Sequence, residues 1–439
     1  MSKPVDPVET QPKDPATTLP YGVPRGLVQV PNRGRIVTFA GLGINLALGV
    51  LYSWSVLSKE IPSAWGWTET GKSWPYACAC LVFCLVMVPA GRMQDRIGPR
   101  IVATLGGVLV GIGMILASFT TTLTGYLIGF GLLAGAGIGC GYASATPPAV
   151  KWFPAKKTGL IAGLVVAGFG LASVYIAPLA THLAQEYGLQ TTMLLFGLGF
   201  LVVVVGLAQL LAAPPKGYIP PGTPPAKPGS AAARKEDFTP GEMLATWQFY
   251  VLWFMYACGA GAGLMIISKL AKIAQDQAGL KLGFVLVAVL AIGNGGGRIG
   301  AGLLSDRIGR KATMFICFVV QAVAIMALSR ARADSFLAQP VVLALLSAVI
   351  GANYGANLAL FPSVTKDYYG LKDFGVNYGL VFTAWGLGGF MLSLLAGRVY
   401  DQTHAFTFAY YCSAGLLLAA ALVTFVVQAP QAKTQAPAA

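Results

Sequence analysis

The sequence has few charged residues, and this scarcity decides the class of protein. Only 10% of its 439 residues are Asp, Glu, Lys or Arg, whereas a soluble domain usually carries about 25%. The chain therefore has too few charges to cover a water-exposed surface, which excludes an ordinary soluble globular protein. By contrast, 56% of the residues are hydrophobic, and they fall in long blocks. Helical blocks of about 20 apolar residues span the ~30 Å hydrocarbon core of a bilayer.

Residues that bind metals or form disulfides are also scarce. The chain has two histidines and seven cysteines, and Cys78 and Cys80 are not spaced as a CxxC pair. All seven cysteines lie inside apolar blocks, where a thiol acts as a small buried hydrophobe. We therefore expect no metal site, no cofactor and no disulfide. We also find no nucleophile with an adjacent base, so the chain is not expected to be an enzyme.

The apolar blocks predict twelve transmembrane helices. They cover residues 35–58, 73–92, 99–119, 122–149, 159–184, 190–212, 246–270, 281–303, 312–330, 339–364, 375–399 and 406–428. The predicted domains are a disordered cytoplasmic tail (1–34), a first six-helix bundle (35–212), a Pro-, Gly- and charge-rich cytoplasmic linker (213–245), a second six-helix bundle (246–428) and a second cytoplasmic tail (429–439). No cleavable signal peptide is expected, because no charged segment followed by a short apolar segment begins the chain.

The net charge of +14 has two possible explanations. Nucleic-acid binding is one, but the distribution of the charge favours the positive-inside rule of membrane proteins. If both termini are cytoplasmic, that side holds 21 of the 30 Lys and Arg residues and the other side holds 8, with Arg298 left inside a helix. We expect a multi-pass protein of the inner (plasma) membrane with both termini in the cytoplasm, and no nucleic-acid partner.

The two halves of the chain repeat one another. Four pairs of segments match in order at a shift of 210 to 216 residues: 58–59 with 268–269, 91–100 with 302–311, 138–142 with 350–354, and 163–171 with 379–387. Six helices separate equivalent positions, so the two copies have the same orientation. Parallel six-helix halves related by an axis along the membrane normal predict an all-α membrane protein with the major facilitator fold.

One repeated motif joins helices two and three, and again helices eight and nine. It has the form Gly-x-x-x-Asp-Arg-x-Gly and contains Asp95 and Arg96 in the first copy and Asp306 and Arg307 in the second. Its Asp can accept hydrogen bonds at a helix start, and its Arg can pair with an acid or a helix C-terminus. We expect these four residues to form a structural latch at the cytoplasmic face that tunes the rocking of the halves.

Longer segments resemble one branch of the major facilitator superfamily, which holds the monocarboxylate transporters and the oxalate/formate antiporters. The best match is the basic loop and glycine-rich helix KWFPAKKTGLIAGLVVAGFG at 151–170, supported by LYSWS at 51–55 and GRVYD at 397–401. The resemblance covers most of residues 35–428. It implies a transporter of small organic anions, and it implies a substrate-binding arginine on helix eight, a position that Arg298 fits.

Arg298 is predicted to anchor the substrate. It is the only charged residue that this pattern places well inside an apolar block, about 10 Å from Ser305 at 1.5 Å per residue. An intramembrane charge usually faces a cavity and indicates function, although a long side chain could also reach the cytoplasmic face. A guanidinium binds a carboxylate through two parallel hydrogen bonds.

Asn294 precedes Arg298 by one helical turn. In the resembling branch an Asp often stands at this position and is tied to proton coupling, together with a Lys in helix one. This chain has Asn294, and its first helix has no Lys before Lys59. No Asp, Glu or His is expected near the middle of the membrane. The proton would then travel with the substrate or a water, or the cycle would be an anion exchange.

Further polar and aromatic residues on neighbouring helices complete the predicted site. A small organic anion would need one cation, a few hydrogen-bond donors and aromatic walls. Any one of these side chains could equally be packing. The candidates beside Arg298 and Asn294 are Asn45, Tyr52, Tyr142, Tyr354, Asn357, Tyr378, Phe382 and Trp385.

Together these features predict a carrier for small monocarboxylates such as lactate, pyruvate or acetate, with a proton as co-substrate and alternating access as its mechanism. An oxalate/formate-type anion antiporter is the alternative in the same class. A channel or signalling protein is the alternative outside it, but a channel would favour a pore lined by repeated charges or carbonyls. The resemblance also implies a Lys on helix eleven of oxalate exchangers, and Trp385 stands where that Lys would be.

Overall fold

In the computed structural model, all regular elements of the described residues are helices, as the sequence predicts. The structure describes residues 32–215, 218, 220, 221, 237–279, 283–333, 335–370 and 373–430. Most of the two predicted tails and of the linker (213–245) lies outside these ranges. The described end of the linker contains a short helix, α9 (Pro240–Leu244), which begins with a capping box between Thr239 and Glu242.

Two successive sets of helices make up the molecule. The first set is α1 (Gly34–Leu48), η2 (Gly49–Ser53), α2 (Trp54–Lys59), η3 (Ser63–Trp65), α3 (Glu69–Ile97), α4 (Pro99–Ser118), α5 (Leu123–Tyr126), η4 (Leu127–Ala134), α6 (Gly135–Lys151), α7 (Ala155–Leu171) and α8 (Ser173–Ala208). The second set is α10 (Trp247–Ala278), α11 (Gly283–Ile308), α12 (Arg310–Ser329), η5 (Phe336–Ala338), α13 (Pro340–Tyr369), α14 (Phe374–Thr403) and α15 (Thr407–Val426).

The described helices cross a membrane-thick layer twelve times. Eleven of them are long and apolar enough to be spans, and one of these runs for 50 residues from Gly159 to Ala208. At 1.5 Å per residue it would be about 75 Å long, far more than a bilayer core of about 30 Å. Gly188 breaks it with φ 78° and ψ 163°, values that favour glycine, so this stretch makes two crossings. The predicted pair 159–184 and 190–212 corresponds to these two arms.

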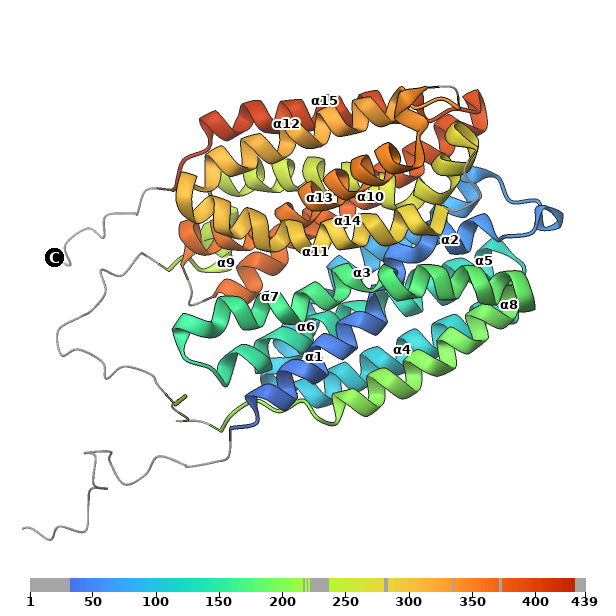
Figure 1. Ribbon diagram of the computed structural model, residues 1–439. Helices are drawn as coiled ribbons and strands as arrows, with labels where there is room; N and C mark the ends of the chain where they lie inside the picture. The colour runs from blue at the N-terminus through green and yellow to red at the C-terminus, as the bar shows by residue number, and fades with distance from the viewer. Residues whose placement is uncertain are drawn as a thin grey trace, which may run out of the picture.

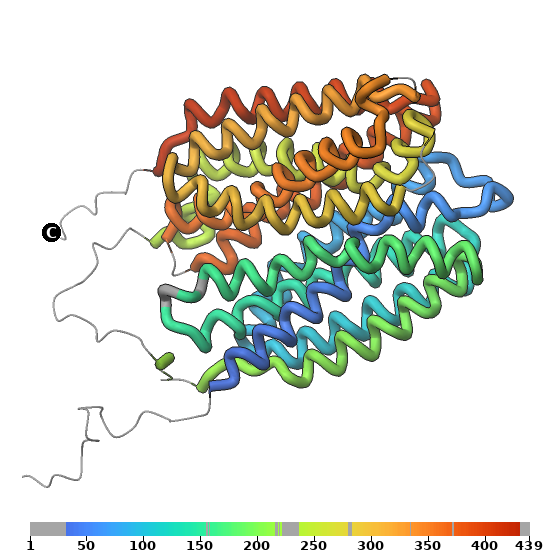
Figure 2. The backbone as a smooth tube through the Cα atoms, viewed as in Figure 1, coloured from blue at the N-terminus to red at the C-terminus, as the bar shows by residue number. Residues whose placement is uncertain are grey.

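The two sets of helices lie side by side (Figure 1), and the backbone tube shows the same division (Figure 2). We call residues 34–208 the first half and residues 247–426 the second half. The start of α1 and the end of α15 lie at one end of the molecule, which we call the near end. The loop that contains η3 lies at the opposite end, which we call the far end. Between the halves, α3 packs along α14, α11 packs on α7 and α8, and α10 packs on α2.

Glycines allow α11 to pack closely against α13 in the second half. A Cβ atom added to Gly293 or Gly297 would overlap the backbone of α13 at Ala348 or Ala352, so only glycine permits this close approach. The packing turns this face of α11 towards α13 and leaves Ile292 and Ile299, 56% and 61% exposed, on its outer face. Arg298 follows Gly297 directly and is thereby held in the interior.

Two helix boundaries differ from the prediction in a way that matters. Helix α10 continues to Ala278, eight residues beyond the predicted end, and α3 begins at Glu69, four residues before the predicted start. The longer helices bring Lys269 and Glu69 inside the helical layer, with 2% and 8% of each residue exposed. Arg298 is therefore not the sole buried charge, contrary to the expectation. The expectation that no carboxylate lies near the middle of the membrane is unaffected, because Glu69 is at the end of α3. Each of the two charges can be buried because the other neutralises it.

Candidate functional site

Arg298 lies in α11 on the side that faces the first half. The residue is only 6% exposed. Its Nε donates to Asn294 Oδ1 (3.1 Å), and its Nη1 donates to the backbone carbonyl of Val166 in α7 (2.8 Å). The side chain therefore crosses from the second half to the first and joins the two halves at the centre of the molecule.

Two buried hydrogen-bond donors at this point have no partner among the described residues. They are Arg298 Nη2 and Asn294 Nδ2. The amide of Asn294 is oriented by the bond that its Oδ1 accepts from Arg298, so its NH2 group is the free end. A buried donor without an acceptor costs about 1–3 kcal/mol. The oxygens of one carboxylate would satisfy both donors, so the arrangement favours an anionic ligand.

A glycine lies beside the free guanidinium nitrogen. A Cβ at Gly170 of α7 would lie only 3.2 Å from Arg298 Nη2, so a larger residue there would press on the guanidinium. Tyr142, in α6, also lies near the Arg298 guanidinium. The cation is thus approached by a glycine and a phenol from the first half.

Aromatic rings from both halves surround this position. The Tyr142 ring contacts Phe83 and Phe169 edge-on, with centroids 5.3 and 5.4 Å apart, and stacks on Phe382 of α14 at 6.2 Å. Phe382 in turn stacks on Trp385 at 5.1 Å. These rings can supply an apolar wall for the methyl or methylene part of a small anion.

A chain of hydrogen bonds links the halves next to this wall. The Trp385 indole donates to the Tyr354 hydroxyl (2.8 Å), and the Tyr354 and Tyr52 hydroxyls are 2.5 Å apart. An indole N–H is only a donor, so Tyr354 must accept from it. One of the two phenols donates its hydrogen in the bond between them. The hydroxyl hydrogen of the other phenol remains available to another acceptor.

The exposed fractions indicate from which end the site is reached. Tyr52, Tyr354 and Trp385 are 3%, 0% and 0% exposed. Tyr142 and Tyr378 are only partly buried. Tyr142 is in contact with rings of both halves, so its exposed part opens into the space between the halves. Tyr378 lies one turn from the near end of α14, where its ring packs on Phe382 at 5.7 Å and its hydroxyl lies 3.4 Å from that of Tyr256. The aromatic cluster is therefore less completely covered on its near side than on its far side.

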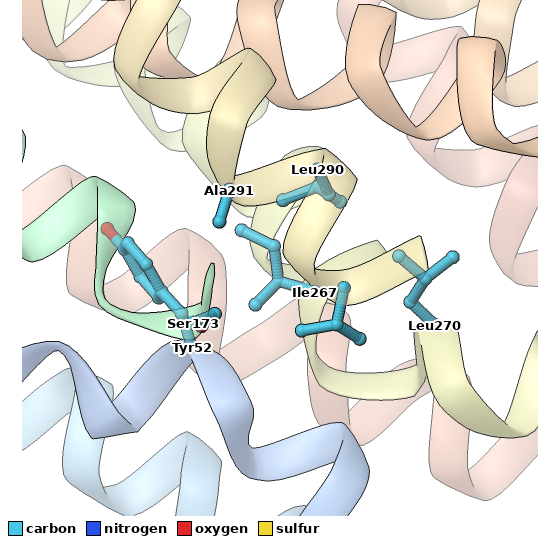
Figure 3. Close-up of a pocket in the computed structure, with 7 residues that line it drawn as sticks. Tyr52, Ser173, Ile267, Leu270, Leu290 and Ala291 are labelled. Carbon is cyan, nitrogen blue, oxygen red and sulfur yellow. The ribbon is translucent and has the colours of Figure 1, made fainter. Parts of the chain in front are cut away.

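The far side of the site is closed by apolar side chains. Figure 3 shows Tyr52 and Ser173 of the first half facing Ile267, Leu270, Leu290 and Ala291 of the second half. The cavity between them is too narrow to hold a water molecule. Since Leu290 and Ala291 precede Asn294 on α11, this seal lies between Arg298 and the far end.

Two of the predicted site residues lie elsewhere. Asn45 donates from Nδ2 to the Val165 carbonyl (2.9 Å) and so fastens the first helix to α7. Asn357 donates to the Asn353 carbonyl (3.1 Å), and its amide lies against Gly259 of α10. The structure brings the other eight predicted residues into one cluster.

The four predicted latch residues lie at the near end, and the bonds that the structure shows for them stay within one half. Asp95 accepts from Lys151 Nζ at 3.1 Å, and Asp306 accepts from Arg310 Nη1 at 2.9 Å. Arg96 and Arg307 are exposed at the same end. All four are remote from Arg298, and their latch role stays a prediction.

Three aromatic residues of the cluster escaped the sequence reasoning as ligand candidates: Phe83, Phe169 and Tyr256. Phe83 contacts Tyr142, Phe169, Phe382 and Trp385. A phenylalanine in an apolar helix carries no signal that separates a cavity wall from core packing. Phe169 did carry one, because it occupies the repeat position of Trp385.

Comparison with known proteins gives a consistent result. The family model described as Major Facilitator Superfamily matches residues 34–329 and 277–439. The chain is 29% identical to the uncharacterized MFS-type transporter YhjX of Escherichia coli (strain K12) over 81% of this chain and 86% of that protein. It is 29% identical to the oxalate:formate antiporter of Oxalobacter formigenes (90% and 92% covered) and 27% identical to human monocarboxylate transporter 11 (94% and 85% covered). The family expected from the sequence motifs is confirmed.

Proposed function

Because this chain belongs to the major facilitator superfamily, we propose that it is a secondary transporter of small monocarboxylates that works by alternating access. The observation that carries the proposal is the pair of unpartnered donors, Arg298 Nη2 and Asn294 Nδ2, buried between the two halves. A carboxylate at this point would accept from both. Moving the two halves about it would then expose it to each end in turn.

The charge of the site supports a monoanion. Arg298 is the one cation among the residues that contact this aromatic cluster in the described structure, since the other buried cation, Lys269, is neutralised by Glu69 at 3.0 Å. A monocarboxylate would balance Arg298, and its apolar part would lie against Phe169, Phe382 and Trp385. A dicarboxylate would bring one unpaired negative charge into a buried site, at an effective cost of several kcal/mol.

We further propose that the near end is cytoplasmic and that the protein lies in the inner (plasma) membrane. The Lys and Arg residues of the connections support this, because 21 of 30 then lie on the cytoplasmic side. The parts that move are the two six-helix bundles, 35–212 and 246–428. With the far end sealed and Tyr142 partly exposed, the structure would be the cytoplasm-facing state.

A proton is the proposed co-substrate, since an anion crossing with a proton does not oppose the membrane potential. An organic anion antiporter is the second candidate, favoured by the 29% identity to an oxalate:formate antiporter over most of both chains. No carboxylate lies beside Arg298 among the described residues, and the buried Glu69 is engaged at the far end. One uptake experiment can therefore decide between proton symport and anion exchange.

The experiment is uptake of labelled lactate, pyruvate and acetate into proteoliposomes that contain the purified protein. We expect uptake by the wild type and loss of uptake by Arg298→Ala. Arg330→Ala is the matched control, because Arg330 is exposed directly after α12, at the far end, and lies outside both the site and the predicted latch. Stimulation by an inward proton gradient would support symport, whereas stimulation only by preloaded internal anion would support exchange. Normal uptake by Arg298→Ala would refute the proposed site.

A further inference from the structure

Glu69 bonds to the second half through its backbone amide, its backbone carbonyl and its carboxylate. It is the first residue of α3, at the far end of the first half, and it is only 8% exposed. Its carboxylate accepts from Lys269 Nζ of α10 at 3.0 Å, and its backbone carbonyl accepts from the same ammonium group at 3.2 Å. Lys269 is 2% exposed, so the pair is shielded from solvent.

The backbone amide of Glu69 is held by the second half as well. Asp401, near the end of α14, accepts from the Glu69 amide through Oδ1 (2.7 Å) and from the Thr70 amide through Oδ2 (2.8 Å). These amides are at the N-terminus of α3, where backbone donors lack partners within the helix and a negative charge is stabilised. Thus the amide, the carbonyl and the carboxylate of Glu69 all bond to the second half.

The charged groups around this network balance one another. Lys72 of α3 lies 3.1 Å from the Glu69 carboxylate, and Lys272 of α10 lies 3.8 Å from it. Lys272 also pairs with Asp276 at 3.1 Å. Tyr400 of α14 donates its hydroxyl to Asp276 at 2.6 Å, and its ring lies 4.5 Å below the Lys272 ammonium. Three cations therefore meet three carboxylates, with no net charge to attract or repel a substrate.

The network lies directly over the apolar seal of Figure 3. Ile267 and Leu270, which line that seal, flank Lys269 on α10. Tyr76, two turns below Glu69 on α3, donates its hydroxyl to the Leu264 carbonyl of α10 at 3.3 Å. A substrate passing between Arg298 and the far end would have to separate these contacts.

We propose that Glu69, Lys269 and Asp401 form a charge lock that holds the far end closed, and that breaking this lock is the step that exposes the Arg298 site to the far side. The inference rests on the proposed alternating access but not on the identity of the substrate. The closed state gains the Lys269–Glu69 bonds and loses the hydration of both ions, while the open state regains that hydration. The lock is therefore reversible, yet removal of Glu69 leaves the Lys269 ammonium buried without its carboxylate in the closed state only. Removal of Lys269 breaks its bonds across the halves, but Lys72 and Lys272 still pair with the Glu69 carboxylate.

The test measures opening of the far end directly. Ser73 lies on α3 against Gly397 of α14 and is only 1% exposed. In the test, Ser73 is replaced by cysteine, a residue of similar size, which serves as the reporter. A membrane-impermeant maleimide is applied from the far side to the reconstituted full chain. Its reaction at residue 73 is followed by tandem mass spectrometry, in which the fragment ions distinguish a label at residue 73 from one at Cys78, Cys80 or Cys84 on the same peptide.

We expect Glu69→Gln to raise the labelling rate about tenfold or more, since breaking a buried pair shifts such an equilibrium by more than this. Lys269→Gln should raise it less, because Lys72 and Lys272 still pair with the Glu69 carboxylate. Lys72→Gln is the matched control: it removes a charge from the same carboxylate but leaves the bonds between the halves intact, so labelling should stay near the wild-type rate. The double variant Glu69→Gln/Lys269→Gln should label more slowly than Glu69→Gln alone, because the Lys269 ammonium no longer lies buried without a partner.

If the Glu69→Gln variant were labelled at the wild-type rate, the proposed lock would be overturned. If that variant does not fold, Asp401→Asn decides, since it weakens the hold on the α3 terminus without unpairing Lys269. Faster labelling would support the lock and unchanged labelling would overturn it. The assay needs no substrate, so a lock that behaves as expected in a protein that fails to carry monocarboxylates would refute only the proposed function.

Discussion

Replacing Arg298 by lysine keeps the positive charge of the site but changes its hydrogen-bonding geometry. In the wild type, Nε and Nη1 are engaged by Asn294 and by the Val166 carbonyl, and Nη2 remains for the ligand. A lysine ammonium has three donors on a single atom, so it cannot bond to both protein acceptors and present a separate, oriented donor to a carboxylate. We therefore expect Arg298→Lys to bind and transport poorly.

The size of the effect follows from the bonds that are lost. A hydrogen bond to a charged group contributes about 1.5–3 kcal/mol, and 1.4 kcal/mol is tenfold in affinity. Loss of one charge-assisted bond should thus weaken monocarboxylate binding by roughly tenfold to a hundredfold. Arg298→Ala, which also removes the charge, should weaken it by more than Arg298→Lys does.

The assay is titration calorimetry of the purified protein with the best substrate, combined with initial uptake rates in proteoliposomes. Arg330→Lys is the control for the general effect of this exchange in the second half, because Arg330 is exposed directly after α12, at the far end, outside the site and the predicted latch. Thermal unfolding should be recorded for every variant, since Arg298 also joins the halves through Val166. A dissociation constant for Arg298→Lys within about threefold of the wild type, less than 1 kcal/mol, would refute the reasoning.

Three further predictions concern charge selection and coupling. Oxalate should inhibit wild-type uptake much less than lactate does, and Trp385→Lys should increase inhibition by oxalate; equal inhibition by both anions in the wild type would contradict the single-cation argument. Uptake should rise with an inward proton gradient and leave the membrane potential unchanged, which a potential-sensitive dye can check; a gradient-independent rate that needs internal anion would contradict symport. Asn294→Asp should place a carboxylate on Arg298 Nε, so that substrate binding weakens at neutral pH and recovers on acidification, whereas Asn294→Leu should show no such recovery.

The sequence was sufficient for most of the fold. Apolar blocks of bilayer length and the repeated segments predict twelve crossings in two similar halves, because a helix in lipid must satisfy its backbone bonds internally. The gap between the predicted helices 159–184 and 190–212 also falls at Gly188, where the backbone of α8 leaves helical geometry. The first crossing is also broken, because the 3-10 helix η2 lies between α1 and α2. No feature of the sequence indicated this break.

The site was predictable where the residue type is unusual for its surroundings. Arg298 stands out because a charge inside an apolar block needs a reason, and Asn294 follows from helical spacing. Phe83 and Tyr256 do not stand out, since aromatic residues are common in any membrane helix. Asn45 and Asn357 are ambiguous in the opposite sense: an intramembrane amide indicates a hydrogen-bond partner, and in the structure each donates to a backbone carbonyl, so their role in substrate binding stays a prediction.

Glu69 and Lys269 were missed because each is unremarkable at the end of an apolar block. Their significance comes from a partner 200 residues away in the chain, and only the packed structure supplies it. The two buried charge sites also differ in a physical respect that separates their roles. Every polar group of Glu69 is bonded within the protein, so that site is complete when the far end is closed. Arg298 and Asn294 each retain a buried donor, so that site becomes complete only when an acceptor enters.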